Sequence, residues 1–177
     1  MMNEIISKHT IYTGKIITVE KKALQLPNGK IVDREFVDHK PATAMIAILN
    51  DTILLVSQYR IGSNLQMLEI PAGLIEENED PSICAKRELQ EEIGYEPKSI
   101  ELLGKYYLSP GFSNEIIYLY LCTNLTPCKL PQDDDEFITI HYLPISEIND
   151  FLKSGKCNDI KTAFALSLLL NKITSRR

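Results

Sequence analysis

Residues 73–95 constrain this chain more than any other segment, because they combine the start and stop signals of a helix with crowded carboxylates. Asp80 suits the N-cap, Pro81 the first helical position and Gly94 the left-handed residue that follows a helix. Apolar side chains recur along the same span at every fourth position and form one stripe: Ala85, Leu89 and Ile93. We therefore expect a helix here with one face buried.

The other side of the expected helix carries Glu88, Glu91 and Glu92, directly after Arg87. A helix turns by about 100° per residue, so these carboxylates fall within a sector of roughly 100°. Like charges this close destabilise a helix unless cations neutralise them. A hard divalent cation such as Mg²⁺ prefers oxygen ligands and suits phosphate substrates. A solvated acidic face is the simpler alternative. The strand and tight loop indicated by residues 69–74 favour a metal site instead.

The spacing of these residues resembles the Nudix box of the Nudix hydrolases. Many fixed residues at fixed offsets make this a specific signal, and the one departure is Tyr95, where an aliphatic residue is more usual. The resemblance implies that the chain hydrolyses a nucleoside diphosphate linked to another moiety, using Mg²⁺ or Mn²⁺. The matching positions are Gly73, Glu79, Arg87, Glu88, Glu91, Glu92 and Gly94.

The resemblance also assigns roles to individual residues. Glu88 and Glu92 would bind metal, with Glu91 assisting and the backbone carbonyl of Ala72 as a further ligand. Glu79 and Arg87 would pair with each other and orient the loop. The residues that support the box structurally are then Gly73, Glu79, Arg87 and Gly94.

Composition agrees with a cytoplasmic enzyme. The 177 residues suffice for one domain with a real core. The formal charge of −5 gives no electrostatic reason to expect nucleic-acid binding. Neither the start of the chain nor residues 164–170 has the apolar length of a signal peptide or a membrane span. The cysteines lack CxxC or zinc-like spacing and are expected to be reduced structural thiols: Cys84, Cys122, Cys128 and Cys157.

The remaining pattern indicates strands interleaved with few helices, an α+β fold. Two hairpins are expected, one turning at residues 27–29 between strands 16–26 and 31–39, the other at residues 50–51 between strands 44–49 and 53–59. Further strands are expected at 100–108, 116–122 and 137–143. Ser146 and Asp159 would cap two later helices, the second with a buried stripe at Ile160, Ala163, Phe164, Leu168 and Ile173. The Nudix resemblance implies an α/β/α sandwich with a mixed sheet and an N-terminal antiparallel sheet.

Several other segments resemble the ADP-ribose pyrophosphatase branch of the Nudix hydrolases. Residues 108–115 have ordinary turn chemistry, yet their proline lies where that branch has one. Residues 34–35, 58–60, 69–73, 135–137 and 159–163 resemble it as well. An arginine matches phosphate bidentately, although a salt bridge is the alternative reading for either arginine. The branch also includes enzymes for GDP-mannose and other nucleotide sugars. The candidate substrate-binding residues are Arg34, Arg60, Glu69, Pro110 and Gly111.

A carboxylate is expected to orient or deprotonate the attacking water. The first candidate is Glu136, which lies in the acidic loop 132–136 and could close over a substrate. Asp133 and Asp134 in that loop are expected to be solvated. Glu91 and Glu115 are alternative bases.

The N-terminal strands bear on assembly. Residues 1–40 are expected to form a hairpin region used for dimerisation and residues 41–177 the Nudix hydrolase domain. Unpaired strand edges tend to be covered. The branch that the chain resembles packs its N-terminal sheet across a two-fold axis. We therefore expect a homodimer in which Arg34 and its neighbours contact the adenine end of the substrate across the interface.

Other functions on the same fold are a nucleotide sensor without catalysis, an isoprenoid diphosphate isomerase and an enzyme that removes oxidised nucleoside triphosphates. The sensor reading would require a missing carboxylate, but Glu88, Glu91 and Glu92 are all present. The isomerase reading needs a cysteine that faces the carbon skeleton, and no motif places one there. The loop at Pro110 argues against the triphosphate reading by analogy alone.

Overall fold

The computed structural model describes residues 4–132 and 136–175 of the 177. The chain separates into two compact units, one formed by residues 1–42 with 105–117 and the other by residues 43–104 with 118–177. Asp133, Asp134 and Asp135, for which expectations were stated from the sequence, lie outside the described residues.

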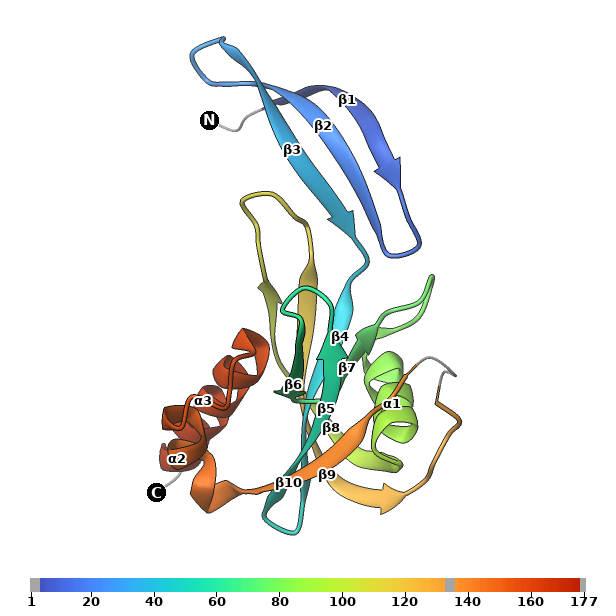
Figure 1. Ribbon diagram of the computed structural model, residues 1–177, viewed down its shortest axis with the longest axis vertical. Helices are drawn as coiled ribbons and strands as arrows, with labels where there is room; N and C mark the ends of the chain where they lie inside the picture. Colours follow the sequence, from blue (N-terminus) through green and yellow to red (C-terminus); the bar gives the residue numbers. More distant parts are fainter. Residues whose placement is uncertain (1–3, 133–135, 176–177) are drawn as a thin grey trace. The chain divides into compact units, whose positions relative to one another are not determined.

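The first unit contains a three-stranded antiparallel sheet, β1 (Glu4–Thr13), β2 (Ile17–Gln25) and β3 (Ile31–His39), in that order (Figure 1). The hairpin expected between β2 and β3 is present, in register from Ile17 opposite His39 to Gln25 opposite Ile31. Its turn uses Gly29 at a φ of 80°. Strand β1 was not foreseen from the sequence. All ten of its residues are exposed, so no buried face imposes an apolar alternation that could be read.

The loop of residues 108–115, which follows β8 (Tyr95–Tyr107), is fastened to β3. The backbone N–H of Val37 donates to the carbonyl of Phe112 at 2.7 Å. The side-chain Oδ1 of Asn114 accepts from the backbone N–H of His39 at 2.8 Å. The loop therefore has a defined conformation, as residues 108–115 with their turn chemistry suggested.

The second unit is built on a larger sheet. Its path runs β10–β5–β4–β9–β8, with β6 paired to β5 and β7 paired to β4. The strands are β4 (Ala42–Leu49), β5 (Thr52–Arg60), β6 (Leu65–Glu69), β7 (Ala72–Leu74), β8 (Tyr95–Tyr107), β9 (Ile116–Pro127) and β10 (Thr139–Pro144). The helices are α1 (Pro81–Glu92), α2 (Ile148–Lys153) and α3 (Ile160–Thr174), with a 3-10 turn η1 (Ile145–Glu147) before α2.

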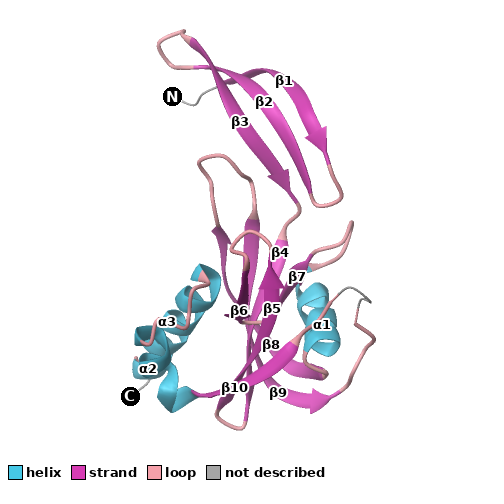
Figure 2. Ribbon diagram, in the orientation of Figure 1, coloured by secondary structure: helices cyan, strands magenta, loops and turns pink. Residues whose placement is uncertain are grey.

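Helix α1 covers one face of this sheet while α2 and α3 cover the other (Figures 1 and 2). The expected α/β/α arrangement with its separate N-terminal antiparallel sheet is confirmed. The core under α1 draws on β4, β5 and β9. Since successive side chains of a strand point to opposite faces, the residues between these core positions lie toward α2 and α3. Strand β4 is consequently buried over most of its length, and β5 is buried at residues 53–56.

The helix signals at residues 80–94 are confirmed. Asp80 caps α1 by accepting from the backbone N–H of Ser82 at 2.8 Å, and Gly94 follows the helix at a φ of 76°. The stripe of Ala85, Leu89 and Ile93 is buried, with 0%, 0% and 3% of each residue exposed.

Two expectations for the later helices are wrong. Helix α2 begins after Glu147. Ser146, the expected cap, lies inside the 3-10 turn instead. Helix α3 is capped by Asp159 as expected, but its buried face is different. Ile160 is 73% exposed and Phe164 39%, whereas the buried residues are Thr162, Ala165, Leu166 and Leu169. No described helix has both the length and the apolar character needed to cross a membrane.

The burial of α1 gives a test of the fold. We expect Leu89→Ala to lower the free energy of unfolding by about 2–5 kcal/mol, because it removes fully buried methyl groups and leaves a cavity. Ile83→Ala is the matched control, since Ile83 lies on the same helix with 58% of its surface exposed. Urea denaturation followed by circular dichroism measures both. Equal losses in the two variants would contradict the packing described here.

Candidate active site

Arg87 holds the start of α1 to the loop before it. Its Nε and Nη2 donate to the two oxygens of Glu79 at 2.9 and 3.1 Å. Its Nη2 also donates to the carbonyl of Leu74 at 3.2 Å. Its Nη1 donates to Glu88 Oε1 at 2.8 Å and to Glu91 Oε2 at 2.9 Å. The pairing of Arg87 with Glu79 is the one that the sequence implied, and the same guanidinium also offsets the charge of the two other carboxylates.

Gly73 lies directly against the carboxylate of Glu88. A Cβ atom at position 73 would stand 1.9 Å from Glu88 Cδ and 2.0 Å from Oε1. Only glycine leaves this space to the carboxylate, which explains the residue without invoking an unusual φ. The neighbouring backbone N–H of Ala72 donates to Glu92 Oε2 at 3.1 Å. The start of β7 thus contacts both carboxylates that were predicted to bind metal.

These carboxylates are buried and close enough to repel each other. The pKa of Glu88 is raised to about 7, chiefly by burial, with Arg87 acting against the rise and the charges of Glu91 and Glu136 adding to it. Burial also raises the pKa of Glu92 well above its usual value, with the charges of Glu88 and Glu136 acting in the same direction. The structure therefore brings Glu136 within electrostatic reach of Glu88 and Glu92. Glu91 lies at the edge of this group, held by Arg87.

The donor set fits a hard divalent cation. All of its side-chain ligands are carboxylate oxygens, and the mutual repulsion of Glu88, Glu92 and Glu136 is what a cation would relieve. Among the described residues, no three Asp, Glu, His or Cys side chains are close enough together to hold a metal ion. Arg87 and the N–H of Ala72 hold the carboxylates in their present positions. A cation that binds would favour the charged form of Glu88 and so compete with its proton.

Arg60 and Glu69 form a fork beside this group. Arg60 Nε and Nη2 donate to Glu69 Oε1 and Oε2 at 2.9 and 2.8 Å. The hydrogen bonds to Glu69 raise the pKa of Arg60, and the charge of Glu92 adds to the effect, so the guanidinium lies within electrostatic reach of the carboxylates. The Arg60 side chain is 41% exposed and that of Glu69 only 2%. The carboxylate of Glu69 is thus enclosed and paired with Arg60, and its contact with substrate stays a prediction.

Lys161 also belongs to this ion-paired group, although the sequence indicated no functional role for it. Its side chain is only 12% exposed and forms ion pairs with Glu69 and with Asp159. A DIKTA segment offered no signal of this contact, because 92 residues separate Lys161 from Glu69.

The other predicted substrate and base residues belong to the first unit. Arg34 is exposed on β3 and donates from Nη1 to the carbonyl of Asp33 at 2.9 Å. Pro110, Gly111 and Glu115 lie in the loop fastened to β3, where the backbone N–H of Leu108 donates to the carbonyl of Glu115 at 3.2 Å. Their roles stay predictions.

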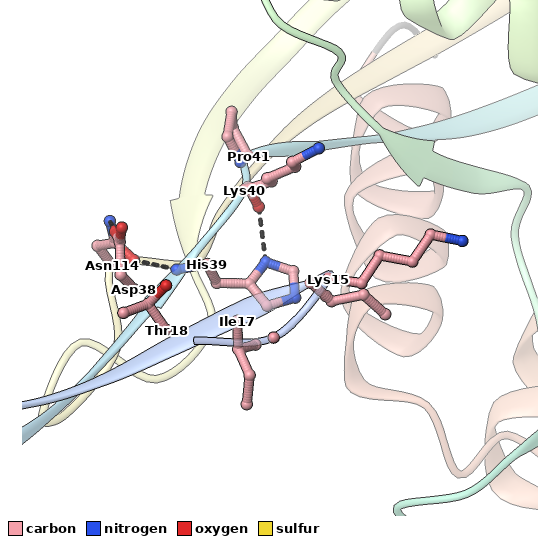
Figure 3. Close-up of a pocket in the computed structure, with 10 residues that line it drawn as sticks. Lys15, Ile17, Thr18, Asp38, His39, Lys40, Pro41 and Asn114 are labelled. Atoms are coloured by element: carbon pink, nitrogen blue, oxygen red, sulfur yellow. Dashed lines mark hydrogen bonds between the residues drawn. The ribbon is translucent and has the colours of Figure 1, made fainter. Parts of the chain in front are cut away.

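A pocket of about 430 Å³ in the first unit has a different character (Figure 3). Its lining includes Lys15, Asp38, His39, Lys40 and Asn114. The ring Nδ1 of His39 donates to the carbonyl of Lys40 at 2.6 Å, and its backbone N–H donates to Asn114. These contacts give His39 a structural role, and Asp38 is the one carboxylate among the lining residues, all of which the structure describes.

Comparison with known proteins places the chain in a family. The NUDIX domain family matches residues 38–162, well over half of the chain. The methanol dehydrogenase activator of Bacillus methanolicus is 38% identical over 93% of this chain and 90% of the relative. The ADP-ribose pyrophosphatase of Bacillus subtilis (strain 168) is 36% identical with the same coverage. The crystal structure of an ADP compounds hydrolase superposes with a TM-score of 0.90 at 23% identity, covering 99% of this chain and 96% of the other.

The chain therefore belongs to the NUDIX domain family, and the solved structure shows that it has the same fold. The box of residues 73–95, with its loop, capped helix and clustered carboxylates, accounts for this membership in physical terms.

The close approach of Gly73 to Glu88 gives a test of the metal site. We expect Gly73→Ala to weaken Mn²⁺ binding by about 10- to 100-fold, because the new methyl group displaces a ligand carboxylate. Titration followed by electron paramagnetic resonance measures the free metal. The matched control is Gly62→Ala, since a Cβ at Gly62 meets nothing within 4 Å. Unchanged Mn²⁺ affinity in Gly73→Ala, with the fold intact, would remove Glu88 from the ligand set.

Proposed function

We propose that this protein is a divalent-metal-dependent pyrophosphatase that cleaves nucleoside diphosphate sugars, with ADP-ribose as substrate and AMP and ribose 5-phosphate as products. The observation that carries the proposal is the group of Glu88, Glu92 and Glu136 beside the guanidinium of Arg60. Carboxylates that need a cation and an arginine that matches phosphate are the two parts that diphosphate cleavage requires.

Glu88, Glu92 and the carbonyl of Ala72 would hold Mg²⁺ or Mn²⁺, which polarises phosphoryl oxygens and lowers the pKa of bound water. Arg60 would hold one phosphate through the face of its guanidinium that Glu69 does not use. Glu136 would take the proton from the attacking water. The water oxygen then bonds to one phosphorus, and the bridging oxygen leaves with the other phosphate. Glu91 and Glu115 are the alternative bases.

Two arguments favour this reaction over others on the same fold. Cys84 and Cys122 are fully buried, and burial raises the pKa of each thiol to about 12. Neither thiol suits the exposed cysteine that an isoprenoid diphosphate isomerase needs. The sensor reading loses support because the carboxylates that it would lack are present and grouped.

The choice of ADP-ribose rests on the relative named ADP-ribose pyrophosphatase. The other relative is named for the activation of a dehydrogenase, so the reaction itself is argued from the carboxylates and Arg60 of this chain. GDP-mannose or another nucleotide sugar would use the same chemistry with a different base or sugar. Arg34, Pro110 and Gly111 are proposed substrate contacts by resemblance.

We also propose a cytoplasmic homodimer that binds no nucleic acid. The free thiols accord with a reducing compartment, and the formal charge of −5 disfavours polyanions. The N-terminal sheet exposes apolar side chains that a partner subunit would cover: Ile5, Ile6, Ile11 and Tyr12 are 56%, 49%, 60% and 57% exposed.

Hydrolysis of ADP-ribose with Mg²⁺ tests the reaction, with GDP-mannose beside it and products separated by ion-exchange chromatography. We expect AMP and ribose 5-phosphate from the wild type, and a kcat lower by about 10²- to 10⁴-fold in Glu136→Gln, because this substitution removes the base. Glu92→Gln should lose turnover together with metal binding.

The matched control is Glu77→Gln, which alters an exposed glutamate in the loop before α1 and should leave the rate unchanged. Faster cleavage of GDP-mannose would keep the reaction and replace the substrate. Nucleotide binding without turnover of any substrate would favour the sensor.

The assembly has its own test. We expect size-exclusion chromatography with light scattering to give twice the chain mass of 20.1 kDa at micromolar concentration. Ile5→Asp combined with Ile11→Asp should shift the protein to a monomer, because charges replace the apolar surface that would be buried. A stable wild-type monomer would refute the dimer.

A further inference from the structure

The first turn of α3 is tied to the end of β6 more firmly than packing a helix requires. Asp159 Oδ2 accepts from the backbone N–H of Thr162 at 3.0 Å, which is sufficient to cap the helix. Asp159 Oδ2 also accepts from Lys161 Nζ at 2.9 Å, and Lys161 reaches Glu69 in turn. Thr162 Oγ1 accepts from the backbone N–H of Ile70 at 2.8 Å. Both the side chain and the backbone at the end of β6 are thus fixed by this one turn.

The burial of these groups shows that the contacts are not incidental. Glu69 is 1% exposed and Thr162 0%. Burial alone would raise the pKa of Glu69, but the hydrogen bond from Arg60 and the charge of Lys161 reverse this and lower it. Two cations and two carboxylates therefore neutralise one another around the Glu69 side chain, which is only 2% exposed, while Arg60 reaches the surface. A buried ion group of this kind depends on every member, because removal of one leaves an uncompensated charge.

The network leads through Glu69 to Arg60. Glu69 Oε2 accepts from both Arg60 Nη2 and Lys161 Nζ, while Oε1 accepts from Arg60 Nε. Because Lys161 fixes the plane of the carboxylate, the paired guanidinium is fixed as well. Nη1 of Arg60 makes no hydrogen bond to any residue that the structure describes, so a donor of fixed orientation remains for a ligand.

The same turn also fixes the backbone that leads to the metal carboxylates. Thr162 holds Ile70, the carbonyl of Pro71 accepts from the backbone N–H of Met45 at 2.9 Å, and Ala72 donates to Glu92. The segment from Glu69 to Ala72 therefore binds Arg60 through the Glu69 side chain at one end and contacts Glu92 through Ala72 at the other. Its placement sets how the arginine and the carboxylates face a common ligand.

We propose that Lys161 is a positioning residue for the reaction, and that the first turn of α3 aligns Arg60 with the metal carboxylates through Glu69. This inference rests on the proposed function, because it assigns Arg60 to a substrate phosphate. Lys161 itself does not contact the substrate. Its effect passes through the orientation of Arg60.

Steady-state kinetics of Lys161→Met with ADP-ribose and Mg²⁺ test this. Misplacing a substrate-holding group by a fraction of an ångström is costly, so we expect KM to rise by roughly 10- to 100-fold with a smaller change in kcat. Mn²⁺ affinity should be unchanged. The matched control is Lys172→Met, which removes an ion pair with Glu101 near the other end of the same helix and should leave KM unchanged.

A double-mutant cycle with Arg60→Gln decides whether Lys161 acts through Arg60. If it does, Lys161→Met adds little to the effect of Arg60→Gln. Independent, multiplying effects of the two substitutions, or an unchanged KM in Lys161→Met, would overturn the inference. Should Lys161→Met not fold, Asp159→Asn keeps a good N-cap while weakening the hold on Lys161, and should raise KM in the same direction.

Calorimetric titration of ADP-ribose in EDTA separates this inference from the proposed function, since binding then depends on the protein side chains and no turnover occurs. Wild-type binding without turnover in Mg²⁺ would overturn the proposed cleavage, while weaker binding by Lys161→Met would still support the positioning role. Equal affinity of the two proteins would overturn that role. A wild type that neither binds nor cleaves ADP-ribose or GDP-mannose would overturn both.

Discussion

The rest of the site depends on the ion pairs that the guanidinium of Arg87 forms with the surrounding carboxylates. Helix α1 brings Glu88, Glu91 and Glu92 close together, and two of these carboxylates are also buried. Without a cation nearby, these carboxylates would move apart through mutual repulsion or become protonated. Arg87 supplies one permanent positive charge, and because its fork also engages Glu79 and Leu74, the same contact fixes the loop against the helix. The charge balance and the geometry of the site therefore have one origin.

The parts of this architecture that could be predicted from the sequence are those that depend on local chemistry. Asp80, Pro81 and Gly94 define α1 because caps act on their own helix, and Asn50 and Asp51 form their turn at positive φ for the same reason. The carboxylate group could be predicted because one helical surface carries most of it. Glu136 lies on a separate segment and was proposed from its acidic loop, and the structure brings its charge near Glu88 and Glu92.

The failures share a physical cause, which is that tertiary contacts overrode the local pattern. On α3, Ile160 and Phe164 suggested a buried stripe, yet Thr162 occupies the buried face because its hydroxyl accepts from Ile70. The burial of a polar residue cannot be predicted from the sequence until its hydrogen-bond partner is known. The pairing of Glu69 with Lys161 was hidden from the sequence for a related reason. The two residues are 92 positions apart, so only the fold shows that their charges meet.

Strand β1 has a consequence for the dynamics of the first unit. None of its ten residues is buried within its own chain, so ladder hydrogen bonds to β2 and surface contacts such as the ion pair of Lys8 with Glu20 hold it in place. Backbone amides in such an element open with little free energy and exchange their protons with solvent early. The amides of β4 and of residues 53–56 in β5, where the strands are buried, are expected to exchange most slowly. Amide exchange should therefore be faster in the N-terminal sheet than in the large sheet. A partner that covers β1 would slow exchange there and reduce this difference.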